Sequence, residues 1–142
     1  MIRQKDYLIR LIEEFAQVLA AMLGLKERRN YKELYEYARK QYLPYTGLTA
    51  TQLAALPTEG FAKTLLEQVP ELSTPQLEVL ATLLLHEGDA CYELGEAAAS
   101  RHRLQQALDL YQYLETADAK IVSLVRRQRM QQIHLLLQHL NA

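Results

Sequence analysis

The sequence has few residues that break or cross-link a chain, with one cysteine, five glycines and four prolines among 142 residues. The single cysteine, Cys91, excludes an internal disulfide and any metal site built on several cysteines. With so little glycine and proline beside abundant leucine, alanine, glutamine and glutamate, the composition indicates helices. We therefore expect an all-α fold, in one domain covering residues 1–142.

A long apolar run and a strong net charge are also missing. The longest uncharged apolar-rich run, residues 15–25, is too short to span a bilayer. The first residues continue directly into an amphipathic pattern, so we expect no secretory leader, no membrane partner and a cytoplasmic location. The net charge is −1, although residues 57–99 hold eight acidic residues and one basic residue. We expect most of this uneven charge to lie on solvated surfaces.

Apolar periodicity predicts a pair of helices over residues 4–43. The first runs over 4–23, with an apolar stripe that includes Ile12, Phe15 and Leu19, and Gly24 suits its C-terminus. Asn30 can cap the second helix, which Pro44 is expected to stop.

Residues 44–73 form an irregular connector that prolines and glycines interrupt. Within it, Thr49 and Gln52 have the spacing of a capping box at the start of a short helix. Residues 61–69 are a second short helical candidate. The apolar residues of this region need burial, so we expect it to be ordered.

A helical hairpin is predicted over residues 74–114. A hydroxyl cap at Ser73 or Thr74, followed by Pro75, is a strong helix start. Gly88 inside this helix indicates close approach of the next helix, and Gly95 is expected to end it. A last helix over 118–140 brings the total to about five to seven. The polar middle of that helix either overhangs solvent or lines a polar cleft.

The hairpin resembles a tetratricopeptide repeat over residues 81–114. The run from Gly88 to Gly95 matches the turn of such a repeat, and Ala107-Leu108-Asp109-Leu110 matches its later apolar motif. Glu87 stands where a leucine is common. A step of one repeat length in either direction puts Ala54 and Val122 at the position of Gly88, so a tandem array is absent.

The start of the chain, Asp6-Tyr7-Leu8-x-Arg10-x-Ile12-Glu13, looks like that of a group of small uncharacterised bacterial all-α proteins. These proteins also carry a later tetratricopeptide-like hairpin. This second resemblance implies no known activity.

The tetratricopeptide resemblance implies a face that binds a peptide or a helix. Carried over residue by residue, this face comprises Thr82, Leu85, Asp89, Tyr92 and Glu93. Members of the family that clamp a C-terminal carboxylate place lysine and asparagine where this chain has Leu85 and Asp89. The resemblance therefore implies a basic or apolar ligand. Arg127 and Arg129 of the last helix can face the same groove, or can neutralise Asp89 and Glu93 within the chain.

Residues capable of chemistry do not form a recognisable constellation. His86-Glu87 begins like a zinc-protease signature, but Ala90 occupies the position of the second histidine. We expect His86 to be a half-exposed helix residue and Cys91 to belong to the core. We therefore expect no catalytic, cofactor or metal site, and a protein that is not an enzyme.

The sequence favours a protein–protein interaction module with an unknown protein or peptide partner. One alternative is a homo-oligomer that associates through the apolar faces of its first and last helices. A second alternative is a nucleic-acid binder through basic residues of the last helix, namely Lys120, Arg126, Arg127 and Arg129.

Overall fold

The computed structural model describes residues 2–119 and 122–141, with all their side chains except those of residues 2–5 and 8. This part of the chain is an all-α single domain without strands. It contains seven helices, in line with the five to seven predicted: α1 (Ile2–Glu27), α2 (Tyr31–Thr46), α3 (Ala50–Ala54), α4 (Phe61–Gln68), α5 (Thr74–Glu93), α6 (Ala97–Ala117) and α7 (Leu124–Asn141).

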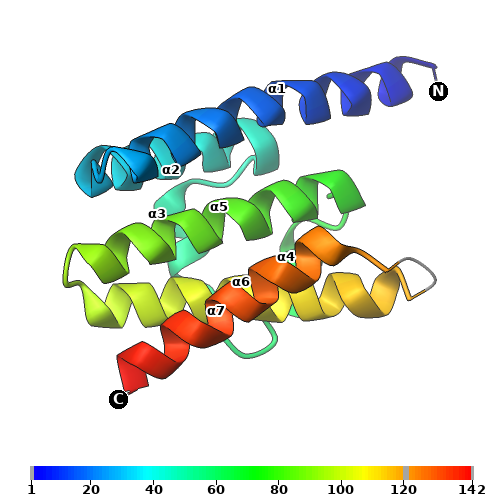
Figure 1. The fold of residues 1–142 in the computed structure, drawn as a ribbon. Coiled ribbons are helices and arrows are strands. Elements are labelled where there is room, and N and C mark those ends of the chain that lie inside the picture. The colour runs from blue at the N-terminus through cyan, green and yellow to red at the C-terminus, as the bar shows by residue number, and fades with distance from the viewer. Residues whose placement is uncertain (1, 120–121, 142) are drawn as a thin grey trace.

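Helix α5 lies at the centre of the bundle and contacts α1, α2, α6 and α7 (Figure 1). Residues 79–91 are buried without a break. A helix enclosed on all sides has no solvent face for polar side chains. Thr82, His86, Glu87 and Asp89 are nevertheless buried in it. Each of these side chains therefore needs a polar partner or must stay uncharged.

Helix α6 packs closely against α5 at Gly88, as the sequence predicts. A Cβ atom at this position would lie 2.7 Å from Leu104 Cγ. The hydroxyl of Ser100 donates a hydrogen bond of 2.7 Å to the Gly88 carbonyl oxygen. At the end of α5, Gly95 adopts the left-handed conformation (φ 80°), which confirms the predicted turn.

The structure contains two capping boxes, one predicted at Thr49 and one at Ser73, where the sequence predicted a hydroxyl cap. Thr49 accepts a hydrogen bond from the Gln52 amide, and the Gln52 side chain accepts one from the Thr49 amide. Ser73 and Gln76 make the same reciprocal pair at the start of α5. Both boxes satisfy amide groups that a helix start otherwise leaves without partners.

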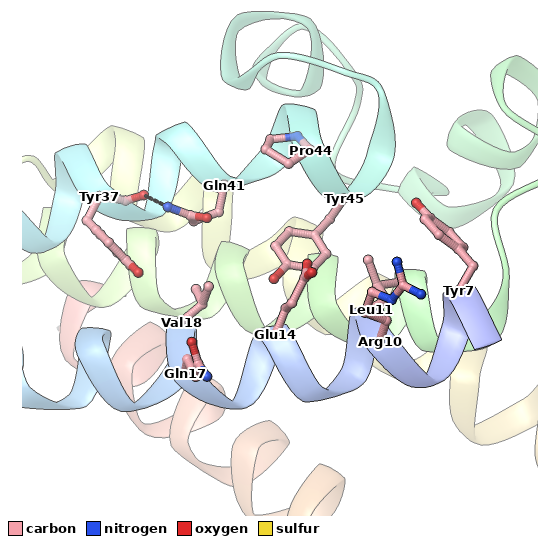
Figure 2. A pocket seen from close by; sticks show the side chains of 10 residues that line it. All are labelled: Tyr7, Arg10, Leu11, Glu14, Gln17, Val18, Tyr37, Gln41, Pro44 and Tyr45. Atoms are coloured by element: carbon pink, nitrogen blue, oxygen red, sulfur yellow. Dashed lines mark hydrogen bonds between the residues drawn. The ribbon is translucent and has the colours of Figure 1, made fainter. Parts of the chain in front are cut away.

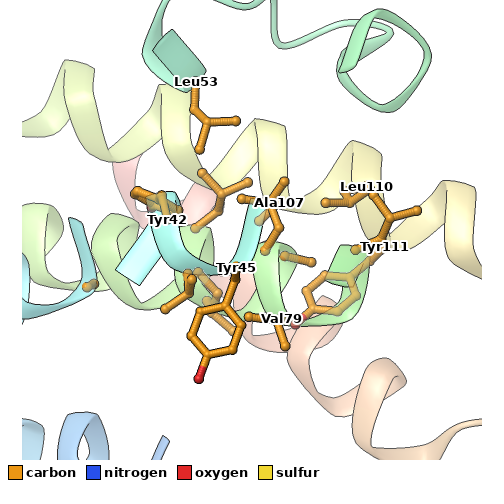
Figure 3. Packing of buried hydrophobic residues seen from close by; sticks show 14 of the residues in the cluster. Tyr42, Tyr45, Leu53, Val79, Ala107, Leu110 and Tyr111 are labelled. Carbon is orange, nitrogen blue, oxygen red and sulfur yellow. The ribbon is translucent and has the colours of Figure 1, made fainter. Parts of the chain in front are cut away.

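The hydrophobic core lies mainly between α2, α5 and α6, and the short helices α3 and α4 close one side (Figure 3). Tyr42, Phe61 and Tyr111 are its largest fully buried aromatic side chains. Cys91 is also buried, as predicted. The connector is ordered because its apolar residues, such as Leu53, enter this core.

The first helix is longer than predicted and passes through Gly24 to Glu27. Arg29, with φ 56°, takes the left-handed position instead of a glycine. The Asn30 amide then donates to the Leu25 carbonyl oxygen, and the Arg29 amide to that of Lys26. These two bonds form a Schellman motif, which explains why the helix ends here.

The second helix also continues beyond the predicted stop at Pro44. It ends at Thr46, and Gly47 provides the left-handed turn with its amide bonded to the Leu43 carbonyl oxygen. Tyr45 and Thr46 are both buried, so the extra residues are stabilised by packing that outweighs the backbone bond lost at Pro44. The Asn30 side chain makes no cap bond and instead donates to Glu33.

The last helix begins at Leu124, not at Asp118 as predicted. Asp118 occupies the C-cap position of α6. Ser123 provides the start of α7, since its hydroxyl accepts a hydrogen bond from the Arg126 amide. Leu124 and Val125, two apolar residues at the start of this helix, are exposed.

Candidate functional site

A groove runs between α1 and α7, with α5 as its floor. We name this cavity of about 320 Å³ the α5 groove. Its lining comes from three helices: Ile12, Phe15 and Leu19 of α1, Thr74, Pro75, Glu78, Val79 and Thr82 of α5, and Arg129 of α7. Most of this lining is apolar, with a single arginine at the α7 edge.

The α1 wall of the groove is a row of apolar side chains. Ile12, Phe15 and Leu19 are three and four positions apart, which puts them on one face of the helix. Phe15 is held by an edge-on contact with Tyr45, with ring centroids 5.6 Å apart. Ile12 remains 53% exposed, so this end of the row has no covering helix in the described structure. The row is therefore available for contact with another molecule.

Arg129 is fixed at the groove by buried hydroxyl groups. Its Nη1 atom donates a hydrogen bond of 3.0 Å to Thr82 Oγ1. Thr82 Oγ1 lies 2.9 Å from the Tyr111 hydroxyl and donates to the Glu78 carbonyl oxygen. Burial raises the pKa of Tyr111, so this hydroxyl stays protonated and can donate to Thr82. These hydrogen bonds hold the Arg129 guanidinium in place, but the hydroxyl groups carry no negative charge to neutralise it.

The neighbouring arginine, Arg126, is instead surrounded by carboxylates. Its side chain is buried and forms ion pairs with three carboxylates, those of Glu78, Glu115 and Asp118. Glu78 lines the groove but is paired in this way with α7. The polar middle of the last helix thus turns two arginines toward the bundle, and only Arg126 meets acidic partners among the described residues.

His86 lies one helical turn beyond Thr82 in α5 and is buried, not half-exposed as predicted. Burial and the nearby charge of Lys26 lower the pKa of His86 to about 4, and Arg129 acts in the same direction. The imidazole is therefore neutral at pH 7. Its Nδ1 atom has no hydrogen-bond partner among the described residues.

The predicted partner-binding residues are only partly brought together. Thr82 and Arg129 meet in the α5 groove, whereas Leu85 is buried in the core. Tyr92 stacks on His139 of α7, with ring centroids 6.3 Å apart. The sequence-predicted face is thus largely filled by the chain itself.

Two charged residues of the predicted set, Asp89 and Arg127, differ from expectation. Asp89 is buried and pairs with Lys26 of α1, with Nζ 2.7 Å from Oδ2. Neither Arg127 nor Arg129 neutralises it. Arg127 is exposed, 3.9 Å from Glu115, and Glu93 is exposed on α5. Asp89 is therefore not available to a basic ligand, because it already has a cationic partner within the chain.

The structure contains a buried ionic cluster that sequence reasoning did not find. Both carboxylate oxygens of Glu87 are bonded: the Tyr42 hydroxyl donates at 2.6 Å, Arg103 Nε at 2.9 Å and Arg39 Nη1 at 3.1 Å. Arg103 also donates to Gln106. The sequence feature that could have indicated this cluster is Glu87, a charged residue within the largely apolar stretch 83–91. Because every member is paired, the cluster is a structural element of the core.

A second cavity, of about 650 Å³, lies between α1 and α2 (Figure 2). Its lining mixes tyrosines, amides and charged groups: Tyr7, Arg10, Leu11, Glu14, Gln17, Val18, Tyr37, Gln41, Pro44 and Tyr45. Glu14 and Tyr45 point toward each other from opposite helices. Burial raises the pKa of Tyr45, and the Glu14 carboxylate adds to the effect. This cavity lacks the apolar row that distinguishes the α5 groove.

The described residues show little that supports metal binding or a reactive thiol. They contain no group of three or more histidine, cysteine or acidic side chains that could hold a metal ion. Burial, with the Glu87 carboxylate nearby, raises the pKa of Cys91 to about 11, so the thiol is protonated at neutral pH. None of the described helices is both long and apolar enough to cross a membrane.

The similarity of residues 81–114 to a tetratricopeptide repeat, and of residues 6–13 to bacterial all-α proteins, rests on the quoted residues alone. A helical hairpin is present at 74–117, but other all-α proteins contain such hairpins too. Both resemblances therefore stay predictions. No protein-family model, no curated protein and no solved structure matches this chain.

Proposed function

We propose that this protein is a non-enzymatic interaction module that binds an apolar helical segment of a partner protein in the α5 groove. The observation that carries the proposal is the apolar row Ile12, Phe15 and Leu19 beside α5, with Ile12 half exposed. Burial of apolar surface stabilises a complex by about 25 cal/mol per Å². A helix-in-groove complex places its apolar anchors three to four residues apart, as in this row.

The proposed site is shifted from the face that the tetratricopeptide resemblance implies. Leu85 and Asp89 are covered by the protein's own helices, so a partner cannot reach them in this structure. Thr82 and Arg129 belong to both sites. The proposal therefore depends on the α5 groove and not on the resemblance. We also propose a cytoplasmic location, which the unpaired thiol of Cys91 supports.

Affinity capture from a lysate of the native host, treated with nuclease, tests this function. Ile12→Ser removes an exposed apolar side chain from the groove, and Leu43→Ser is a matched control on α2, where Leu43 is 54% exposed. Both variants should melt at the wild-type temperature. We expect wild type and Leu43→Ser to retain the same partner and Ile12→Ser to lose it. Recovery of the same proteins with all three would contradict the proposal.

A second candidate function is self-association, because the N-terminal half of α1 also exposes Tyr7 and Ile9. A solution mass of twice the chain mass of 16.4 kDa, reduced to the monomer mass by Ile9→Ser, supports it. A solution mass equal to that of the monomer at all protein concentrations would contradict self-association. The nucleic-acid alternative loses support because Arg126 is already paired with three carboxylates. Lys120 lies outside the described residues.

A further inference from the structure

Arg129 brings a positive charge to the largely apolar α5 groove and is not paired with a carboxylate there. Its hydrogen bond goes to the neutral hydroxyl of Thr82, and none of the ion pairs among the described residues includes it. Arginine has five N–H donors in a fixed fork. One is used by Thr82, which leaves donors for an incoming acceptor. The side chain is only half-buried, so a ligand in the groove can reach it.

The acidic residues around the groove form ion pairs with other cations. Glu78, the acidic residue of the groove lining, is bonded to Arg126 through its Oε1 atom. Asp89 is paired with Lys26. His86 lies between these groups as a buried and unpartnered imidazole. Arg129 is therefore the cation of the groove lining that forms no ion pair among the described residues.

We propose that the partner's helix presents a glutamate or aspartate side chain to Arg129, while its apolar side chains pack on Ile12, Phe15 and Leu19. This inference rests on the proposed function and specifies the chemistry of the ligand. A carboxylate matches the planar fork of a guanidinium, and a charge-assisted bond is shorter and stronger than one between neutral groups. The sequence led to the expectation of a basic or apolar ligand, and the basic alternative required an open Asp89, which is paired with Lys26.

A displayed library of amphipathic helical peptides tests this chemistry. The peptides carry a fixed stripe of leucines and randomised positions along its edges. Selection is made against the full-length wild type and the variants Arg129→Gln, Arg127→Gln and Ile12→Ser, after matching their melting temperatures. Arg127 is a suitable control because it lies on the same helix, is exposed and does not line the groove.

We expect glutamate or aspartate to be enriched about fivefold over glutamine at one edge position on wild type and on Arg127→Gln. This preference should disappear on Arg129→Gln. Enriched peptides without an acidic preference, or a preference that survives in Arg129→Gln, would overturn the inference and leave the groove function intact. Equal recovery on wild type and Ile12→Ser would contradict both the inference and the proposed function.

Discussion

Among single residues, the buried polar side chains of α5 differ in how they are partnered. Glu87 is charged and fully paired with Arg39, Arg103 and Tyr42. His86, its neighbour in sequence, is neutral and lacks a partner at Nδ1. A buried charge is tolerated only with compensating groups, whereas a neutral imidazole can be buried without a counter-charge.

Replacing Glu87 with glutamine should destabilise the protein strongly. Glu87→Gln removes the negative charge between Arg39 and Arg103, and Arg103 is almost completely buried. Breaking a buried ion pair in this way costs roughly 3–5 kcal/mol. Urea unfolding measures the loss. Glu93→Gln, at an exposed position of the same helix, should change the free energy of unfolding by less than about 0.5 kcal/mol.

His86 should make the protein less stable in acid. Its pKa is about 4 in the folded protein and about 6.5 in an unfolded chain. Between these values the unfolded chain binds a proton that the folded protein does not, so lowering the pH favours unfolding. The stabilisation is fully present above about pH 6.5 and is lost as the pH falls to about 4. The whole effect is about 3 kcal/mol.

Urea unfolding across this pH range checks the prediction. We expect His86→Gln to flatten the dependence of stability on pH, since glutamine does not titrate. His134→Gln, which changes an exposed histidine of α7, should keep the wild-type slope. An unchanged slope in His86→Gln would show that other groups cause the acid sensitivity.

Among the helices, the two glycines within α1 and α5 have different roles. Gly88 allows α6 to approach, since an added Cβ would lie 2.7 Å from Leu104 Cγ and 2.8 Å from its Cδ2. Leu104 is fully buried and cannot move without disturbing its neighbours. At Gly24 the nearest atom to an added Cβ is Arg28 Nη1, at an ordinary distance of 3.5 Å.

Alanine substitutions at these two glycines should have opposite effects. Gly24→Ala should raise the free energy of unfolding by about 0.5–1 kcal/mol, because alanine favours the helix interior. At Gly88 the same gain is opposed by overpacking of about 1–3 kcal/mol, so we expect a net loss of about 1 kcal/mol. Thermal melting compares the two variants. Stabilisation by Gly88→Ala would mean that α6 can move away from α5 at little cost.

At the scale of the whole molecule, the features that the sequence predicted correctly are those that depend on residues close together in the chain. The all-α class, the capping box at Thr49, the hydroxyl cap at Ser73 and the turn at Gly95 all depend on residues within a few positions of each other. One wrong boundary occurs where packing decides, since burial of Tyr45 and Thr46 carries α2 past Pro44. The start of α7 was missed for a local reason, because Ser123, and not Asp118, accepts the hydrogen bond that caps it.

The candidate site was harder to predict because its members come from distant parts of the chain. Lys26 pairs with Asp89, and Arg39 with Glu87 across 48 positions. A single sequence does not show which distant charges meet. It therefore placed Asp89 on an open face and left Glu87 unexplained. Thr82 and Arg129 were both named, but the apolar wall from α1 was assigned only to the core or to self-association.

Site-specific photo-crosslinking in the native host tests the central claim most directly. A photoreactive amino acid replaces Ile12 in the α5 groove or, as a control, Leu43 on α2, two positions with nearly equal exposure. We expect a discrete adduct with one other protein from position 12 and none from position 43, with the crosslinked partner peptide forming an amphipathic helix. An adduct only with a second copy would favour self-association. The absence of a position-specific adduct would contradict docking in the groove.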